Sequence, residues 1–305
     1  MDDISKAIEA AKNKLPSIEC RLGEPMKNHT SFMIGGPIRA MFIPKNAGEL
    51  TELCALLDEY GIAPLIIGNG TNLLADDSGT LEMIAVKTTG IGGVSQTGEE
   101  ELTAGAGISL SKLAVFACEC GLSGLEFAHG IPGSLGGAVS MNAGAYGREM
   151  KNVADCTTAY RRGSGIFAVK GAEHDFSYRR SRFSDTGEII ISSVLHLEKG
   201  DAKSINEKMN ELQARRRGSQ PLELPSAGSV FKRPEDGYAA ALIEQAGLKG
   251  FSIGGARVSE KHSGFIVNRG GATFADVMAV IEYVREAVFK QCGIELETEI
   301  KIIRG

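Results

Sequence analysis

The spacing of apolar residues along the chain predicts helices at both ends and strands in the middle. From Ile4 to Leu15 apolar residues recur at the spacing of one helical face, which predicts a helix over residues 3–15. A second helix is expected over 46–60, because Asn46 is suited to cap its start and Gly61 to end it. The same spacing predicts further helices over 110–120, 203–217, 238–246 and 274–291.

Short apolar or alternating runs predict the strands. They lie at 64–67, 81–87, 100–104, 153–160, 166–170, 188–197, 255–258 and 265–268. The last segment, 294–302, alternates strictly and predicts a strand with Glu299 on its polar face; an exposed strand face also explains that glutamate without any function. We see no repeat and no disordered linker, so the chain is predicted to be α+β.

Composition and charge narrow the class of protein. The chain has 305 residues, a net charge of −5 and a pI of about 5.7, which does not fit a nucleic-acid binder. No apolar run reaches the roughly 18 residues of a membrane span, and the acidic start does not resemble a signal peptide. We therefore expect a cytoplasmic protein with no nucleic-acid or membrane partner. The six cysteines and five histidines lack the spacing of metal ligands, so no metal is expected.

The 39 glycines are the most informative count, because they cluster. One cluster, Gly68-Asn69-Gly70-Thr71-Asn72, follows a predicted strand and could bind an anion through its backbone N–H groups. Leu73 stands where a dinucleotide fingerprint needs glycine, and no helix is expected to follow. A plain tight turn remains the alternative.

The second cluster covers residues 130–147 and is rich in glycine, alanine and short polar residues. Its sequence is Gly130-Ile131-Pro132-Gly133-Ser134-Leu135-Gly136-Gly137, followed by Met141-Asn142-Ala143-Gly144-Ala145-Tyr146-Gly147. Such a stretch allows a flat or bulky ligand to lie against the backbone, although tight strand connections would also explain it. Together the two clusters indicate a dinucleotide held outside a Rossmann fold.

Two further segments carry side chains suited to chemistry. Residues 178–183 place three arginines in a short stretch, and the arginine fork suits carboxylate or phosphate, although a solvated turn is the bland interpretation. Residues 225–234 place Ser229 between small and apolar residues with Lys232 nearby, where a serine is usually a turn residue. His129 and His262 adjoin such segments and receive no assigned role.

Taken together, eight segments in order resemble the UDP-N-acetylenolpyruvoylglucosamine reductase (MurB) family, the UDP-N-acetylmuramate dehydrogenases. The resemblance runs from about residue 28 to 302. It rests on Asn28-His-Thr-Ser-Phe32, the first glycine cluster, the two runs 130–137 and 141–147 of the second, Tyr178-Arg-Arg-Ser-Arg-Phe183, Ser226-Ala-Gly-Ser-Val-Phe-Lys232, Leu242-Ile-Glu-Gln-Ala-Gly-Leu-Lys-Gly250 and Leu296-Glu-Thr-Glu-Ile300.

The resemblance implies a fold and a division of the chain. It implies an FAD-binding domain of the vanillyl-alcohol-oxidase/PCMH type with an α+β C-terminal substrate-binding domain. We expect residues 1–80 to form the N-terminal α/β part of the FAD-binding region, 81–200 its strand-rich second subdomain, and 201–305 the substrate-binding domain. The shortness of 250–272 resembles the branch of the family that lacks an extra tyrosine-bearing loop.

The resemblance also implies the reaction and its residues. NADPH would reduce FAD, and hydride would then pass to C3 of UDP-N-acetylglucosamine enolpyruvate, giving UDP-N-acetylmuramate for peptidoglycan. Arg179 would pair with the substrate carboxylate, Glu299 as the acid would hydrogen-bond the enolic group, and Ser229 would protonate C2. Substrate binding is assigned to Lys232, Gln245 and Lys249. FAD binding is assigned to Gly68, Asn69, Gly70, Thr71, Asn72, Gly130, Ile131, Pro132, Gly133, Ser134, Gly136, Gly137, Asn142, Gly144 and Ala145.

Two other classes of protein remain open at this point. An oxidase of the same fold would use O₂ in place of NADPH and would not need Ser229 and Glu299. A non-catalytic flavin-binding protein would keep the glycine clusters for packing alone. We expect a monomer or weak oligomer.

Overall fold

The computed structural model describes residues 2–305, which divide into two compact units. Of the described residues, unit 1 comprises 2–22, 39–69 and 83–215, and unit 2 comprises 23–38, 70–82 and 216–305. Both units are therefore assembled from three stretches of chain. The sequence-based division at residues 80 and 200 stays a prediction. Helix α5 (Ala202–Ser219) continues through the boundary at Arg215.

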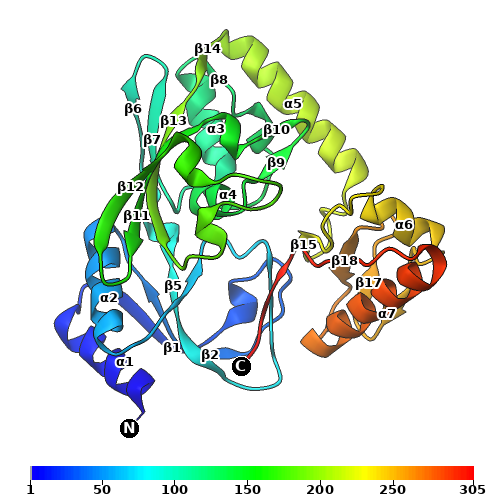
Figure 1. Ribbon diagram of the computed structural model, residues 1–305, viewed down its shortest axis with the longest axis horizontal. Coiled ribbons are helices and arrows are strands. Elements are labelled where there is room, and N and C mark those ends of the chain that lie inside the picture. Colours follow the sequence, from blue (N-terminus) through cyan, green and yellow to red (C-terminus); the bar gives the residue numbers. More distant parts are fainter. Residues whose placement is uncertain (1) are drawn as a thin grey trace. The chain divides into compact units, whose positions relative to one another are not determined.

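The first layer of unit 1 is a four-stranded sheet covered by two helices, α1 (Asp3–Lys14) and α2 (Ala47–Glu59). The strand order is β1 (Glu19–Pro25), β2 (Pro37–Ile43), β5 (Leu81–Lys87) and β3 (Leu65–Ile67). Ile8, Leu53 and Val86 are buried in the shared core, and α1 and α2 lie side by side in Figure 1. Both predicted helices are confirmed: Asn46 accepts a hydrogen bond from the Glu49 N–H, and Gly61 follows with a left-handed backbone.

The second layer of unit 1 is a five-stranded antiparallel sheet. Its order is β12 (Gly165–Lys170), β11 (Ala154–Arg161), β13 (Ile189–His196), β7 (Glu101–Gly105) and β6 (Val94–Gly98). Helices α3 (Leu110–Glu119) and α4 (Leu135–Ser140) belong to the same core. Two-stranded pieces complete it: β8 (Leu122–Ser123) with β14 (Glu198–Lys199), and β9 (Gly144–Ala145) with β10 (Arg148–Glu149).

Helix α4 was not expected, because it carries two consecutive glycines inside the stretch that the sequence analysis treated as loop. Its other residues explain why it forms. Leu135, Ala138 and Val139 are buried in the core of the five-stranded sheet, and that packing outweighs the poor helix propensity of glycine.

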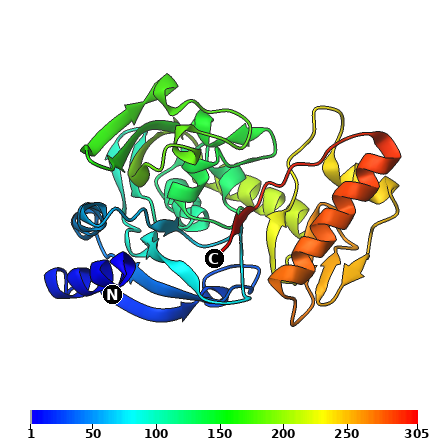
Figure 2. The ribbon, with the colours of Figure 1, turned by 60° about the horizontal axis from the view of Figure 1, so that its bottom comes forward.

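Unit 2 is built on a four-stranded sheet packed against a long helix, α7 (Phe274–Cys292), shown in orange in Figure 2. The strand order is β15 (Ser226–Ser229), β18 (Phe265–Asn268), β17 (Ala256–Val258) and β16 (Ser252–Ile253), and the short helix α6 (Ala239–Gln245) joins the core. A separate parallel pair joins β4 (Leu73–Ala75) to β19 (Lys301–Ile303).

The predicted terminal strand is shorter than expected. Within residues 294–300, Leu296 and Ile300 are buried while Glu295 and Glu297 are exposed, as predicted, but Glu299 is half-buried and regular pairing begins only at Lys301. The earlier residues make an isolated bridge, Phe231 to Thr298, and lie beside residues 230–232, which follow β15. An alternating pattern marks one buried face, and it does not distinguish a ladder from an extended segment.

Among residues 2–305, no helix is both long and apolar enough to cross a membrane. Within the same residues, no three His, Cys, Asp or Glu side chains gather as a metal-binding group.

Candidate active site

In unit 1 the structure brings the two glycine clusters into contact. A Cβ atom added to Gly68 would lie only 2.0 Å from the Ser134 Oγ and 3.0 Å from its Cβ. Ser134 is buried and directly precedes α4. The glycine at position 68 is therefore required so that the two clusters can meet.

Several groups of the second cluster are already used inside the protein. The amide N–H groups of Ile131 and Gly136 donate to the carbonyls of Ala128 and Ala106. These two amides are therefore not available to a phosphate. Added Cβ atoms at Gly136 and Gly144 would likewise meet protein atoms, at 3.0 and 2.6 Å.

Asn142 links the second cluster to the arginine segment. Its side chain is completely buried, its φ is +44°, and both ends of its amide are hydrogen-bonded. Nδ2 donates to the Ser177 carbonyl at 3.0 Å, and Oδ1 accepts from the Lys151 N–H at 2.9 Å. The sequence analysis assigned Asn142 to FAD, and in this structure its side chain holds two backbone segments together.

Arg179 lies on a tight turn that is fixed to the same place. Ser181 Oγ donates to the carbonyl of Ser140, at the end of α4, at 2.7 Å. Arg179 has a φ of +55°, a strained backbone for a residue with a side chain, and its guanidinium lies 5.3 Å from the ring centre of Tyr178. The hydrogen bond of Ser181 thus holds this turn against the end of α4.

The other two arginines of the segment form ion pairs. Arg180 pairs with Asp185 at 2.8 Å on the surface. Arg182 and Arg161 both bind Glu188, whose side chain is only 3% exposed. Burial alone would raise the pKa of Glu188, but the hydrogen bonds from the two arginines outweigh it and the pKa lies below its usual value. This pair anchors the base of the segment.

In unit 2 the other half of the first cluster rests on residues 29–31. A Cβ atom at Gly70 would lie 1.8 Å from the carbonyl oxygen of His29, so this turn tolerates only glycine. The Gly70 carbonyl accepts from the Ser31 N–H at 3.0 Å. His29 itself is buried and binds Glu24 at 2.8 Å.

Unit 2 also places Ser229 and Glu299 on adjacent segments. The Glu299 N–H donates to the carbonyl of Val230, the residue after Ser229, at 2.7 Å. Asn72 Nδ2 donates to the Glu299 carbonyl at 3.2 Å, and the Asn72 carbonyl accepts from the Lys301 N–H. Three residues that the sequence separates widely are thus brought together within one unit. Both Ser229 and Glu299 are half-buried.

The three residues assigned to substrate binding are accessible. Lys232 Nζ pairs with Glu297 at 2.8 Å, and that hydrogen bond lowers the pKa of Glu297. Lys249 pairs with Glu244 at 3.1 Å, and Gln245 is exposed. Exposed pairs of this kind are weak, so both ammonium groups can exchange a carboxylate for a phosphate.

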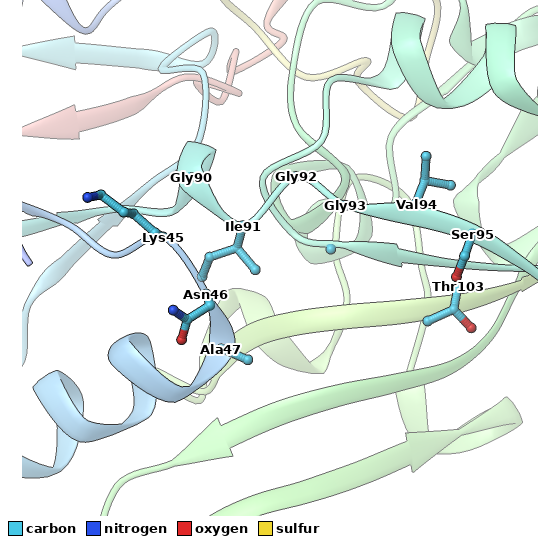
Figure 3. Close-up of a pocket in the computed structure, with 11 residues that line it drawn as sticks. Lys45, Asn46, Ala47, Gly90, Ile91, Gly92, Gly93, Val94, Ser95 and Thr103 are labelled. Atoms are coloured by element: carbon cyan, nitrogen blue, oxygen red, sulfur yellow. The ribbon is translucent and has the colours of Figure 1, made fainter. Parts of the chain in front are cut away.

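Unit 1 also contains a shallow pocket of about 450 Å³ away from these residues. Lys45 and Asn46 lie at one end and Ser95 and Thr103, on paired strands, at the other (Figure 3). None of the lining residues is a predicted site residue, and we assign no function to this pocket.

Two contributors to the site were not predicted from the sequence. Ser31 lies inside the Asn28–Phe32 motif that supports the resemblance, but received no role. Glu297 neutralises Lys232, and its position two residues before Glu299 on the alternating segment could have suggested it. The His262 ring lies in unit 2, within electrostatic range of Glu244 and Lys249, and its burial lowers its pKa.

The residues of unit 1 fit the diphosphate of a dinucleotide. Two glycine clusters meet, a serine hydroxyl lies at their contact, and no acidic side chain is among the assigned residues. Neutral donors on close-packed backbone suit an anion that has to be approached tightly.

Comparisons with known proteins agree with this fit. Residues 38–162 match the FAD binding domain family, and residues 220–303 match the C-terminal domain of UDP-N-acetylenolpyruvoylglucosamine reductase. The chain is 47% identical to the UDP-N-acetylenolpyruvoylglucosamine reductase of Caldanaerobacter subterraneus subsp. tengcongensis, over 97% of both chains. It is 44% identical to that of Alkaliphilus oremlandii, over 99% of both. The crystal structure of the Thermus caldophilus reductase superimposes with a TM-score of 0.79 at 31% identity, covering 94% of this chain and 98% of that one.

Fold and site together define an FAD flavoprotein, an oxidoreductase with a PCMH-type FAD-binding domain and a separate C-terminal domain. Near-complete coverage at this identity then identifies the particular group: the chain belongs to the UDP-N-acetylenolpyruvoylglucosamine reductase family. It is accordingly an enzyme of peptidoglycan biosynthesis with the reductase activity that gives the family its name. The predicted fold class and family are confirmed, and the individual site residues stay predictions.

Proposed function

We propose that the chain catalyses the NADPH-dependent, FAD-mediated reduction of UDP-N-acetylglucosamine enolpyruvate to UDP-N-acetylmuramate. The observation that supports this most directly is the hydrogen bond from the Glu299 N–H to the Val230 carbonyl. It holds a carboxyl group and a hydroxyl group on adjacent segments of unit 2. A non-catalytic flavin-binding protein has no need of that pairing, and an oxidase has no need of a dedicated proton donor.

FAD would be held by the residues of both glycine clusters. When bound, FAD supplies hydride transfer, accepting a hydride from NADPH and releasing it toward C3 of the enolpyruvyl group. The remaining chemistry falls to the side chains of the protein.

Three side chains would stabilise or neutralise the negative charge that develops in that reaction. As hydride reaches C3, negative charge grows at C2 and spreads onto the substrate carboxylate, which the Arg179 guanidinium would pair with. Glu299, as the protonated acid, would donate a hydrogen bond to the same enolic group. Ser229 would deliver its hydroxyl proton to C2, a transfer that requires close positioning because a hydroxyl is a weak acid.

Lys232, Gln245 and Lys249 would bind the rest of the substrate. A nucleoside diphosphate carries charge that two lysines can neutralise, and both lysines now pair with exposed carboxylates that a phosphate can displace. We also propose that the enzyme works in the cytoplasm as a monomer or weak oligomer.

Anaerobic spectroscopy tests this proposal. NADPH should bleach the flavin of the wild-type protein, and UDP-N-acetylglucosamine enolpyruvate should restore its colour. Ser229→Ala should still bleach, but should recover at least about 100-fold more slowly, within the usual range for loss of an acid catalyst. Ser252→Ala, on the exposed edge strand β16, serves as the control and should behave as wild type. Normal recovery by Ser229→Ala would remove the proton-donor role, and a wild-type flavin that stays bleached would exclude this substrate.

A further inference from the structure

Ser31 is hydrogen-bonded both to the turn at residues 70–72, here called the cofactor turn, and to the strand that carries Ser229. Its N–H donates to the Gly70 carbonyl at 3.0 Å, and its Oγ donates to the Ser226 carbonyl at 2.6 Å. Ser226 begins β15, and Ser229 ends it. The Ser31 hydroxyl therefore bonds to a carbonyl 195 residues away in the sequence, while the backbone N–H of the same residue holds the turn at Gly70.

These contacts belong to a closed ring of hydrogen bonds within unit 2. From β15 the ring continues through the Val230 carbonyl to the Glu299 N–H at 2.7 Å. It returns to the cofactor turn through the Glu299 carbonyl and Asn72 Nδ2 at 3.2 Å. The ring thus passes along the cofactor turn, β15 and the segment of Glu299.

The other links of the ring are reinforced by further backbone hydrogen bonds, so a substitution at Ser31 is the most informative test of the ring. The link between β15 and Glu299 is reinforced by a second bond, from the Lys232 N–H to the Glu297 carbonyl at 2.9 Å. The link between Asn72 and Glu299 is reinforced by the Lys301 N–H and by the pairing of β4 with β19. Between residues 29–31 and β15 the Ser31 hydroxyl bonds directly, and the following residue, Phe32, gives further support through its carbonyl, which accepts from Asn268 Nδ2 at 3.1 Å, and through its ring in the same buried cluster as Ala227.

We infer that Ser31 is a positioning residue for the oxidative half-reaction. It fixes the start of β15 relative to the turn at Gly70, and so sets where the hydroxyl of Ser229 stands with respect to bound FAD. The inference rests on the proposed function for the role of Ser229. The hydrogen bond from Ser31 to the Ser226 carbonyl, here called the tether, does not depend on that function. Since displacement of a reacting group by about 1 Å can slow a reaction about 100-fold, one hydrogen bond of this kind is enough to matter.

Stopped-flow measurements on Ser31→Ala holoenzyme separate the two half-reactions. Bleaching by NADPH should stay within about twofold of wild type, because hydride transfer to FAD does not use Ser229. Recovery with UDP-N-acetylglucosamine enolpyruvate should slow by about tenfold or more and show a larger solvent isotope effect. Ser31→Thr keeps the hydroxyl and should restore the rate.

Thr30→Val is the matched control. Thr30 Oγ1 donates to the Ile34 carbonyl at 2.9 Å, so this variant also loses one hydroxyl-to-carbonyl bond, but within its own loop. It should leave both half-reactions near wild type. Hydrogen exchange of the holoenzymes adds a readout that does not depend on turnover: the amides of Val230 and Glu299 should exchange faster in Ser31→Ala and not in Thr30→Val.

The outcomes are distinct. Unchanged recovery in Ser31→Ala, or equal slowing of both half-reactions without rescue by Ser31→Thr, would overturn the positioning role. A wild-type enzyme that is never reoxidised by the enolpyruvyl substrate would refute the proposed function, and hydrogen exchange would then decide the tether. Unchanged exchange at Val230 and Glu299 overturns it, and faster exchange supports it.

Discussion

Replacing Gly68 by alanine would place a methyl group where Ser134 already stands. The added Cβ would be 2.0 Å from the hydroxyl oxygen and 3.0 Å from the Cβ of that serine, whereas ordinary contact begins near 3.4 Å. Rotating the hydroxyl away removes only the first clash, because the Cβ cannot move without the backbone. The two glycine clusters must therefore separate by several tenths of an ångström or more.

The expected cost follows from that displacement. Overpacking of this kind destabilises a protein by about 1–3 kcal/mol. Since the clash falls between the two segments assigned to FAD, we expect the FAD dissociation constant to rise by about tenfold, equivalent to about 1.4 kcal/mol. Urea denaturation measures the first quantity, and titration of flavin fluorescence measures the second.

Two further variants make the experiment decisive. Gly93→Ala is the control, because an added Cβ there meets nothing within 4 Å in the same unit. The double variant Gly68→Ala/Ser134→Gly removes both clashing atoms, and should recover stability and FAD affinity relative to the Gly68 variant alone. The reasoning is refuted if Gly68→Ala binds FAD as wild type does, or if the two substitutions prove strictly additive.

Three other predictions concern the frame of unit 1. Burial lowers the pKa of His174 from 6.5, so as pH falls the imidazole takes up a proton in the unfolded chain first, and the free energy of unfolding should fall below about pH 6.5. His174→Gln should reduce the dependence of that free energy on pH by up to about 1.4 kcal/mol per pH unit. An unaltered pH dependence in urea denaturation would contradict this. Glu188→Gln should lower the free energy of unfolding by about 1–3 kcal/mol, because it breaks a buried ion pair. Glu99→Gln breaks an exposed pair with Lys199 and should change the free energy of unfolding by less than about 1 kcal/mol. Equal effects of the two substitutions would show that burial of the carboxylate is unimportant. Asn142→Ala, which removes two buried hydrogen bonds at a positive φ, should cost about 2–4 kcal/mol, and a melting temperature close to wild type would refute the linking role.

The sequence was most informative where local chemistry decides the structure. The helix over 46–60 was predicted from its cap and its terminal glycine, and both features are present. Helix α4 was not predicted because its stability comes from three side chains buried in a core whose other residues are distant in the sequence. Local helix propensity does not reveal that packing. The glycines of the second cluster were interpreted as making room for a ligand, yet at Gly136 and Gly144 the neighbouring atoms belong to the protein.

The candidate site shows the same division between local and distant information. Residue types and order were sufficient to assign the family, and they selected Ser229 and Glu299. The tether through Ser31 could not be predicted, because a serine hydroxyl bonded to a carbonyl 195 positions away leaves no periodic pattern. The ion pair of Lys232 with Glu297 was not predicted either, although the alternating segment could have suggested Glu297, because the two residues become neighbours only when residues 230–232 pair with the terminal segment.

The discontinuous make-up of the two units has a consequence for synthesis on the ribosome. Every residue of unit 1 has been translated by Arg215, so its sheets and helices can begin to form while unit 2 is incomplete. Unit 2 has to wait: its bonds join Ser31 to Ser226, Phe32 to Asn268 and Asn72 to Glu299, and β4 has no partner until Lys301–Ile303 emerge. The early segments of unit 2, residues 23–38 and 70–82, are therefore left exposed for most of translation, and a chain cut short by its last five residues loses the strand on which β4 depends.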